Sequence, residues 1–238
     1  MSLPPSDKDA VLARVREALR LPARIPHVEG SVSDTIPLLP SKREVTRWLP
    51  AVGPTFEERF ALFAAQAAAL KAEVIRVATP DDVPLCLAQL AKDEGWETSK
   101  PGAIAAHPGL HSQAVVEKAG FIPFLVVSGY DKAALEGCVA GVTACEALVA
   151  QTGSVLVTSK ESGGRALTVL PPHHVVVATA AQLVPDLPAA FERLREVHGK
   201  ALPSMISFIT GPSRTGDIER ILVLGAHGPK RLTILFVG

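Results

Sequence analysis

Apolar positions in the first 54 residues predict a helix followed by an extended arm. Residues 6–21 carry Val, Leu and Ala at helical spacing behind a capping serine, the pattern of an amphipathic helix. Residues 22–54 contain six prolines and few periodic apolar positions, which predicts an extended arm that wraps a surface or a partner. We therefore treat residues 1–54 as an arm that precedes the main domain.

A capping box at Thr55 and Glu58 predicts the first helix of a domain over residues 55–238. From Glu73 onward, short runs rich in Val and Ile alternate with helical segments. Strands are predicted at residues 73–78, 103–106, 124–127, 154–159, 165–170, 174–180, 205–210 and 231–238. Further helices are predicted at residues 79–94, 188–198 and 216–224, with a short one after Pro108.

This alternation of strands and helices predicts an α/β fold. Strands separated by helices form βαβ units, so most of the sheet should be parallel, with right-handed crossovers. The three strands predicted between residues 154 and 180 follow one another too closely for helices to intervene, so some antiparallel pairing should enter as well. We expect a mixed, mainly parallel sheet with flanking helices.

Charge and cysteine content narrow the possible partners. Lys plus Arg and Asp plus Glu both total 24, so the chain has no net field to attract nucleic acid or an anionic membrane. Its three cysteines form no Cys-x-x-Cys pair and no secretory signal precedes them, which favours a reducing compartment, the cytoplasm. No apolar run reaches the roughly 18 residues of a membrane-spanning helix.

The most informative stretch is TGPSRTGDIERILVLGAHGP, residues 210–229. Gly211 and Gly216 have the spacing of a phosphate-binding loop, but the lysine and hydroxyl that bind nucleotide and magnesium are missing, which excludes a nucleoside triphosphatase. If a helix follows this turn, its free N–H groups and dipole favour a carboxylate or phosphate. Three side chains would add donors: Ser213, Arg214 and Thr215.

Acidic residues in the same stretch leave an alternative open. Asp217 and Glu219 lie where a first helical turn is expected, and they can cap that helix themselves. In a ligand site, Glu219 would orient an arginine or accept a hydrogen bond from a ligand hydroxyl. His227, in the turn before the last strand, is either a proton donor to the same ligand or an exposed turn residue.

A second turn could contribute to the same site. Thr152, Gly153 and Ser154 precede an apolar strand and could present two hydroxyls and an open N–H group, or form an ordinary tight turn. Arg165 follows a Ser-Gly-Gly loop and could hold a carboxylate or phosphate, or lie exposed at a hairpin tip. We expect these residues and residues 213–215 to line one cleft at the carboxyl ends of the strands.

Histidines and cysteines give little support for a metal site. Pro108 and Gly109 interrupt any helix that would bring His107 and His111 together. The adjacent His173 and His174 enter a strand, so their side chains should point to opposite faces. Three scattered cysteines do not provide the four usual ligands of an iron–sulfur cluster. We expect this chain to bind no metal or cofactor itself.

Three stretches together resemble the LUD-domain family, and within it the lactate-utilisation C branch. They are GVTACEALVAQTGSVLVTS (141–159), GRALTVLPPHHVVV (164–177) and ISFITGPSRTGDIERILVLGAHGP (206–229). The resemblance covers residues 55–238 and is strongest towards the C-terminus. It implies a fold like that of glucosamine-6-phosphate deaminase, ribose-5-phosphate isomerase and coenzyme A transferases, also seen in formyltetrahydrofolate cyclo-ligase.

The resemblance also implies a role in oxidising L-lactate to pyruvate, with two companion proteins that carry iron–sulfur clusters. In that system this chain would be an accessory subunit that binds a small carboxylate or phosphate. Gln151 stands where such families often have an acidic residue, and because an amide cannot form an acyl anhydride, coenzyme A transfer by that route is not expected. Two alternatives stay open: a free-standing enzyme acting on sugar phosphates or acyl thioesters, and a structural adaptor that docks through residues 22–54.

Overall fold

A computed structural model describes residues 12–14, 16–17, 49–97, 99–109, 111–160, 165–217, 221–224 and 228–238, with only the backbone of 215–217 and 221–224. Contacts divide the chain into Met1–Val45 and Thr46–Gly238. The described residues of the first unit are helical and lie within the helix predicted at 6–21. The predicted arm lies outside the described residues up to residue 48. All features below belong to the second unit.

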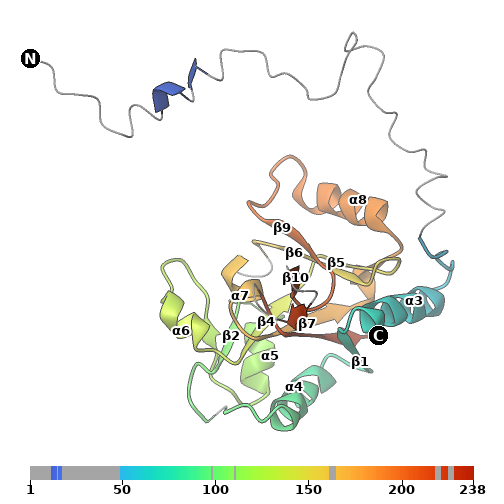
Figure 1. Cartoon of the computed structure of the whole chain (residues 1–238). Coiled ribbons are helices and arrows are strands. Elements are labelled where there is room, and N and C mark those ends of the chain that lie inside the picture. The colour runs from blue at the N-terminus through green and yellow to red at the C-terminus, as the bar shows by residue number, and fades with distance from the viewer. Residues whose placement is uncertain are drawn as a thin grey trace, which may run out of the picture. The chain divides into compact units, whose positions relative to one another are not determined.

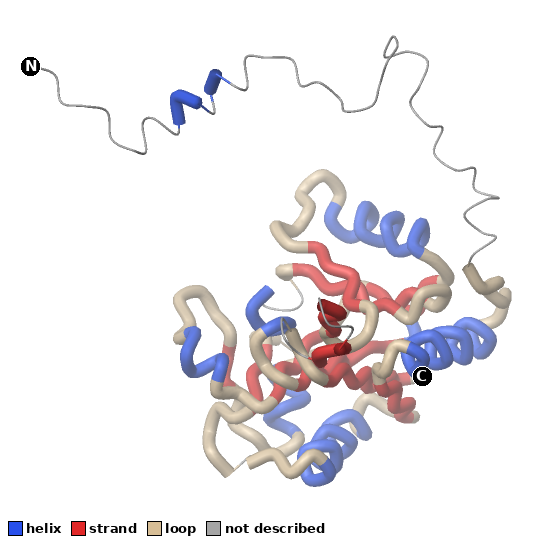
Figure 2. The backbone as a smooth tube through the Cα atoms, viewed as in Figure 1, coloured by secondary structure: helices blue, strands red, loops and turns tan. Residues whose placement is uncertain are grey.

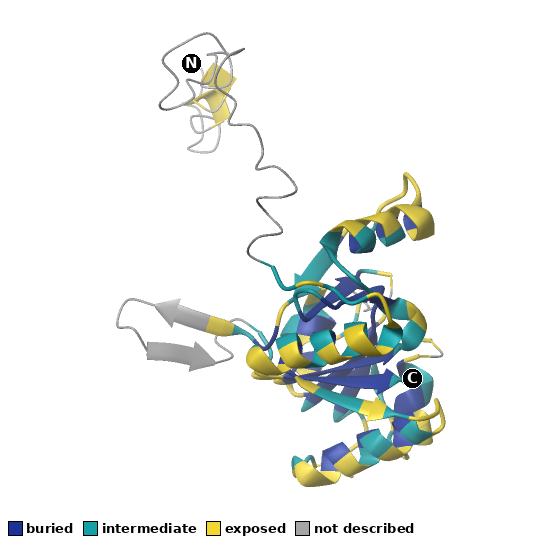
Figure 3. Ribbon diagram, turned by 90° about the vertical axis from the view of Figure 1, so that its right-hand side faces the viewer, coloured by how far each residue is buried: buried dark blue, intermediate teal, exposed yellow. Residues whose placement is uncertain are grey.

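The larger sheet contains six strands in the described part of the chain, and every pairing in it is parallel (Figure 1). Across the sheet, its strands are β1 (Glu73–Val77), β12 (Arg231–Val237), β7 (His173–Thr179), β4 (Ala140–Ala144), β2 (Ile104–Ala106) and β3 (Phe124–Leu125). The middle strands are almost wholly buried, as expected of parallel strands covered on both faces (Figure 3).

A smaller sheet contains the antiparallel pairing. Its order is β8 (Leu183–Val184), β5 (Ala147–Val149), β6 (Ser154–Thr158) and β9 (Ile206–Ile209), with β6 antiparallel to both of its neighbours. Strand β5 begins two residues after β4 ends, so Cys145 and Glu146 carry the chain from one sheet into the other. The α/β fold with a mainly parallel sheet is confirmed, and the antiparallel strands form a layer of their own.

Helices pack on both faces of the larger sheet and on the outer face of the smaller one (Figure 2). They are α3 (Phe56–Ala69), α4 (Asp82–Asp93), α5 (Gln113–Lys118), α6 (Lys132–Glu136), α7 (Arg165–Val169) and α8 (Leu187–His198), with a short 3-10 helix at Ala180–Gln182. Phe63 and Ala67 of α3 pack into the core between the two sheets. Helices α4 and α5 pack on the opposite face of the larger sheet, and α8 packs on the outer face of the smaller one.

Two predicted elements are wrong. Of residues 165–170, predicted as a strand, Arg165–Val169 form helix α7, because six residues are too few to distinguish one helical turn from a strand by apolar spacing. The described residues of 216–224, predicted as a helix, instead lie in two antiparallel strands, β10 (Arg214–Asp217) and β11 (Ile221–Leu224), in which Gly216 pairs with Leu222. The anion site can therefore not be a helix N-terminus.

Candidate functional site

A cavity of about 350 Å³ opens between the two sheets at the amino ends of β7 and β12. One wall comes from β9 of the smaller sheet and the segment that follows it, and another comes from α7. The lining residues are Arg165, Thr168, Val169, His174, Met205, Ile206, Ser207, Ile209, Thr210, Gly211, Pro212, Ser213, Gly228, Pro229 and Leu232. We call this space the amino-edge cavity.

The amino-edge cavity combines one cationic side chain with hydroxyl groups and apolar walls. Arg165 is exposed and is the only charged residue among the described residues that line it. Thr210 and Ser213 add hydroxyls on the adjoining segment. The backbone N–H of Ser213 donates to the carbonyl of Pro229 at 2.9 Å, which fixes the bend at this wall. A guanidinium beside hydroxyl donors suits a carboxylate or phosphate.

His174 forms part of the cavity lining from the larger sheet. It is 1% exposed, and its Nε2 lies 2.8 Å from Thr143 Oγ1 on the neighbouring strand β4. Its Nδ1 has no hydrogen-bond partner among the described residues. Burial, with a smaller contribution from nearby His173, lowers the pKa of His174 to about 3, so the ring is neutral near pH 7.

Gly153 and Gly211, which we expected to leave room for a ligand, instead leave room for helix α3. Gly153 has a φ of +65°, and a Cβ there would lie 2.6 Å from the backbone nitrogen of Ala67. Gly211 has a φ of +85°, and its Cβ would lie 2.6 Å from the carbonyl oxygen of Leu70. Both turns therefore require glycine because the C-terminal end of α3 packs directly against them.

A chain of hydroxyls links the first turn to the cavity. Thr152 Oγ1 lies 2.8 Å from Ser154 Oγ, which lies 2.9 Å from Thr210 Oγ1. Thr210 lines the amino-edge cavity, whereas Thr152, Gly153 and Ser154 stand behind it. The two predicted turns are thus brought together, but only the second contributes lining residues.

Arg214 has a different neighbour from the one expected. Its Nη2 donates to the carbonyl of Leu70 at 2.9 Å, so the guanidinium caps the C-terminal end of α3. The backbone of Thr215 lies in β10. Glu219 and His227 lie outside the described residues, so their predicted roles stay predictions.

The predicted position of the cleft is wrong. Arg165, Gly211 and Ser213 meet at the amino ends of the parallel strands, not at the carboxyl ends. The physical reason is connectivity: α7 leads into the start of β7, and the β10–β11 hairpin leads into the start of β12. A strand at 165–170 and a helix at 216–224 would have placed these residues elsewhere.

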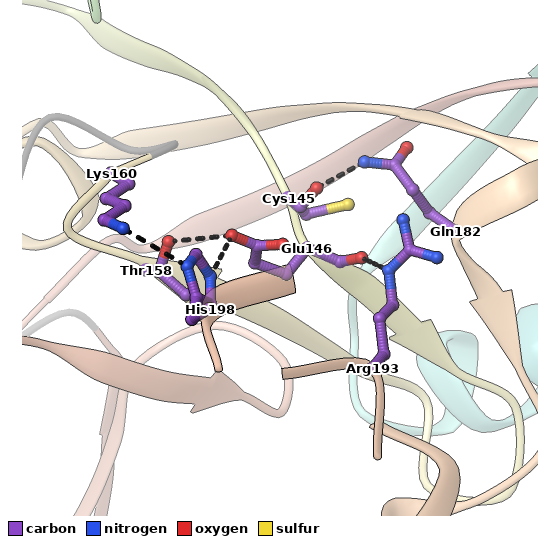
Figure 4. Close-up of polar contacts among 7 residues, drawn as sticks. All are labelled: Cys145, Glu146, Thr158, Lys160, Gln182, Arg193 and His198. Atoms are coloured by element: carbon purple, nitrogen blue, oxygen red, sulfur yellow. Dashed lines mark hydrogen bonds and ion pairs between the residues drawn. The ribbon is translucent and has the colours of Figure 1, made fainter. Parts of the chain in front are cut away.

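The carboxyl ends of the strands carry a polar network that the sequence reasoning missed (Figure 4). Glu146 Oε1 accepts a hydrogen bond from Thr158 Oγ1 at 3.1 Å and lies 2.9 Å from His198 Nε2. Both side chains of this Glu–His pair are more than 90% buried. His198 Nδ1 lies 3.5 Å from Lys160 Nζ at the surface. These four residues are spread over 52 positions, and no local spacing signals that they meet.

Two further side chains hold the crossover between the sheets. Gln182 Nε2 donates to the carbonyl of Cys145, and Arg193 Nε donates to the carbonyl of Glu146 at 2.5 Å (Figure 4). A cavity of about 310 Å³ adjoins these groups. Glu146, Gln182 and Arg193 beside this cavity already have partners within the protein, so we regard the network chiefly as a structural link between the two sheets and α8.

The side chains of His173 and His174 point to opposite faces of β7, as predicted. His173 Nε2 bonds to Thr233 Oγ1 and its ring meets Trp96 edge-on, whereas His174 Nε2 bonds to Thr143 Oγ1. Among the described residues, no group of three or more His, Cys, Asp or Glu side chains is arranged to hold a metal ion. No helix in the described part of the chain has both the length and the apolar character to cross a membrane.

Comparison with known proteins shows the family to which the chain belongs. Lactate utilization protein C from Bacillus subtilis is 34% identical over 99 residues, and its namesake from Anoxybacillus flavithermus is 36% identical over 97 residues. Each alignment covers 41% of this chain, and only 41% and 43% of the two relatives. A crystal structure of a DUF162-family protein from Deinococcus radiodurans has the same fold, with a TM-score of 0.58 at 19% identity over 78% of this chain and 100% of that chain. The LUD-domain model matches residues 60–237, so the chain belongs to the LUD-domain family.

Proposed function

We propose that this chain serves in a lactate-utilisation system as a subunit that binds a small organic anion in the amino-edge cavity. The names of the relatives support a role in lactate utilisation, although the aligned region spans less than half of each relative's length. The observation that supports the site is the convergence of Arg165, Gly211 and Ser213 on one cavity from two distant parts of the chain.

The composition of the cavity suits a small carboxylate or phosphate. Arg165 supplies a guanidinium that can bind two oxygens at once, and Ser213 and Thr210 supply hydroxyl donors beside it. The volume of about 350 Å³ is at the small end of ligand pockets, which fits a metabolite better than a dinucleotide. Met205 and Leu232 add apolar surface to the remainder of the lining.

We propose that the redox step itself depends on companion proteins. Three cysteines without cluster spacing offer no set of four ligands in this sequence. Electrons taken from lactate would then pass through partners that carry iron–sulfur clusters, and this chain would contribute anion binding. Capture of the tagged, full-length chain from cells grown on lactate should recover such partners, identified by mass spectrometry and by their iron content.

Calorimetry tests the binding site directly. The purified chain should bind at least one of L-lactate, pyruvate, propionate and inorganic phosphate. Arg165→Ala should weaken that binding at least about tenfold, because a charge-assisted hydrogen-bonded pair is lost. Arg195→Ala, which removes an exposed arginine from α8, is the matched control and should change nothing. If none of the four anions binds, the proposed site is refuted.

A further inference from the structure

The unpaired nitrogen of His174 is the feature of the amino-edge cavity that its structural role leaves unexplained. A buried polar group without a partner destabilises a protein, and most such groups are paired in native structures. His174 lines the cavity, is 1% exposed, and keeps Nδ1 without a partner among the described residues. A ligand that pairs this nitrogen would remove the penalty.

Hydrogen-bond accounting shows what Nδ1 offers. Thr143 is fully buried, and its hydroxyl has His174 Nε2 as its one partner among the described residues. If Nε2 carried the proton, both the hydroxyl proton of Thr143 and the lone pair of Nδ1 would lack partners. If the hydroxyl donates to Nε2 instead, only the Nδ1–H group is unpaired. The second arrangement leaves fewer buried groups unsatisfied, so Nδ1 is a hydrogen-bond donor.

The imidazole ring of His174 is neutral, and its neutrality determines which part of an anionic ligand can lie against it. Because His174 stays neutral, an ionised oxygen placed there would be desolvated without a compensating charge. The ionised group therefore belongs at Arg165, and a neutral acceptor oxygen belongs at His174. A keto oxygen meets this requirement, since it accepts a hydrogen bond and brings no proton that needs an acceptor of its own.

We propose that the amino-edge cavity selects 2-oxo carboxylates, with the carboxylate paired to Arg165 and the keto oxygen bound by His174 Nδ1–H. This inference rests on the proposed anion site and names its ligand class. Thr143 acts as a positioning residue, because its hydroxyl holds the proton of His174 on the nitrogen that meets the ligand. The apolar walls at Val169, Met205 and Leu232 accept the hydrocarbon chain of the acid.

The expected selectivity is measurable by calorimetry with acids of equal charge. Pyruvate should bind about tenfold or more tightly than propionate. Propionate has no keto oxygen, so the buried Nδ1–H group of His174 would stay without a hydrogen-bond partner when propionate binds. Pyruvate should also bind more tightly than L-lactate. Lengthening the chain from pyruvate to 2-oxobutanoate should tighten binding about fourfold, the effect of one buried methylene.

Two variants distinguish a positioning role of Thr143 from a packing role. Thr143→Val keeps the shape of the side chain and removes the hydroxyl, so the preference for pyruvate over propionate should shrink towards unity while propionate still binds. Thr233→Val removes the equivalent threonine beside His173 on the opposite face and should leave the preference intact. In the unliganded wild-type protein, nitrogen chemical shifts measured by NMR should show His174 protonated on Nδ1. This measurement needs no variant.

The outcomes distinguish this inference from the proposed function. Equal binding of pyruvate and propionate, tighter binding of L-lactate, or a proton on Nε2 of His174 would overturn the selection of 2-oxo acids and leave the anion site standing. Failure of every anion to bind would remove the anion site, and the inference with it. Selective binding of pyruvate that is lost in Thr143→Val and kept in Thr233→Val would support both.

Discussion

Replacing Gly153 by alanine tests whether this turn exists to receive helix α3. Gly153 has a φ of +65°, which costs a residue with a Cβ about 1 kcal/mol. The new Cβ would also lie 2.6 Å from the nitrogen of Ala67 and 2.7 Å from the carbonyl carbon of Gln66, both backbone atoms that cannot move without shifting the helix. Overpacking of this kind adds about 1–3 kcal/mol.

Gly95 provides a matched control, because its φ of +63° is almost the same and nothing lies within 4 Å of its Cβ position. We therefore expect Gly153→Ala to lower the free energy of unfolding by about 2–4 kcal/mol and Gly95→Ala by about 1 kcal/mol. For a domain of this size, the difference corresponds to a loss of about 2–12 °C in Tm between the variants.

Urea denaturation followed by circular dichroism, with thermal melts on the same samples, measures both values. The two variants share the conformational penalty, so the difference between them isolates the contact with α3. Equal losses in the two variants would refute the claim that close packing against Ala67 is the reason for glycine at position 153. Loss of ligand binding without loss of stability in Gly153→Ala would instead assign the turn to a ligand.

Three further predictions concern stability. Arg214→Ala should lower the free energy of unfolding by about 1 kcal/mol, because the carbonyl of Leu70 loses a cationic cap, and Arg214→Lys should restore part of it in urea titrations. Glu146→Leu should lower the free energy of unfolding by about 2–4 kcal/mol, since the buried Nε2 of His198 loses the carboxylate to which it bonds, and a loss under 1 kcal/mol would contradict the burial of that network. Burial lowers the pKa of His173 to about 4 and that of His174 to about 3, so the unfolded state binds more protons and stability falls as the pH drops from about 6.5 towards 4. This loss should approach about 1.4 kcal/mol per pH unit for each histidine, and a flat profile between pH 6.5 and 4.5 would contradict it.

The sequence predicted those strands that are rich in apolar residues and separated by recognisable helices. The apolar runs that became β7 and β12 are buried in the parallel sheet, as that composition predicts, whereas β1, with Glu73 and Arg76, forms a partly exposed edge strand. The failures occurred in short segments. Residues 165–170 and 216–224 carry apolar spacings that suit either periodicity, and only tertiary packing decides between them.

Individual site residues were easier to anticipate than their surroundings. Arg165 and Ser213 were predicted from residue type and neighbouring glycines, and the structure brings both to one cavity. Its position at the amino edge was not predictable, because it depends on which elements precede β7 and β12. The hydrogen bonding of His174 could not be predicted from sequence either, since its Nε2 bonds to a threonine 31 positions away on another strand while its Nδ1 has no partner among the described residues.

Gln151 can be explained by a contact that the sequence does not suggest. Its Nε2 donates to the carbonyl of Pro50 at 2.9 Å, joining the turn to the segment that precedes α3. An ionised acid at this position has no proton to donate, so the amide suits the neighbouring carbonyl better than a carboxylate would. Here the glutamine serves local architecture.

The crossover at Cys145 and Glu146 bears on how the proposed anion site would bind its ligand. Gln182 and Arg193 clamp its two carbonyls, so the layers that supply opposite walls of the amino-edge cavity are joined at a stiff seam. In the proposed anion site, walls held in place in this way would need little entropy for closing around a ligand, so we expect association without a slow conformational step.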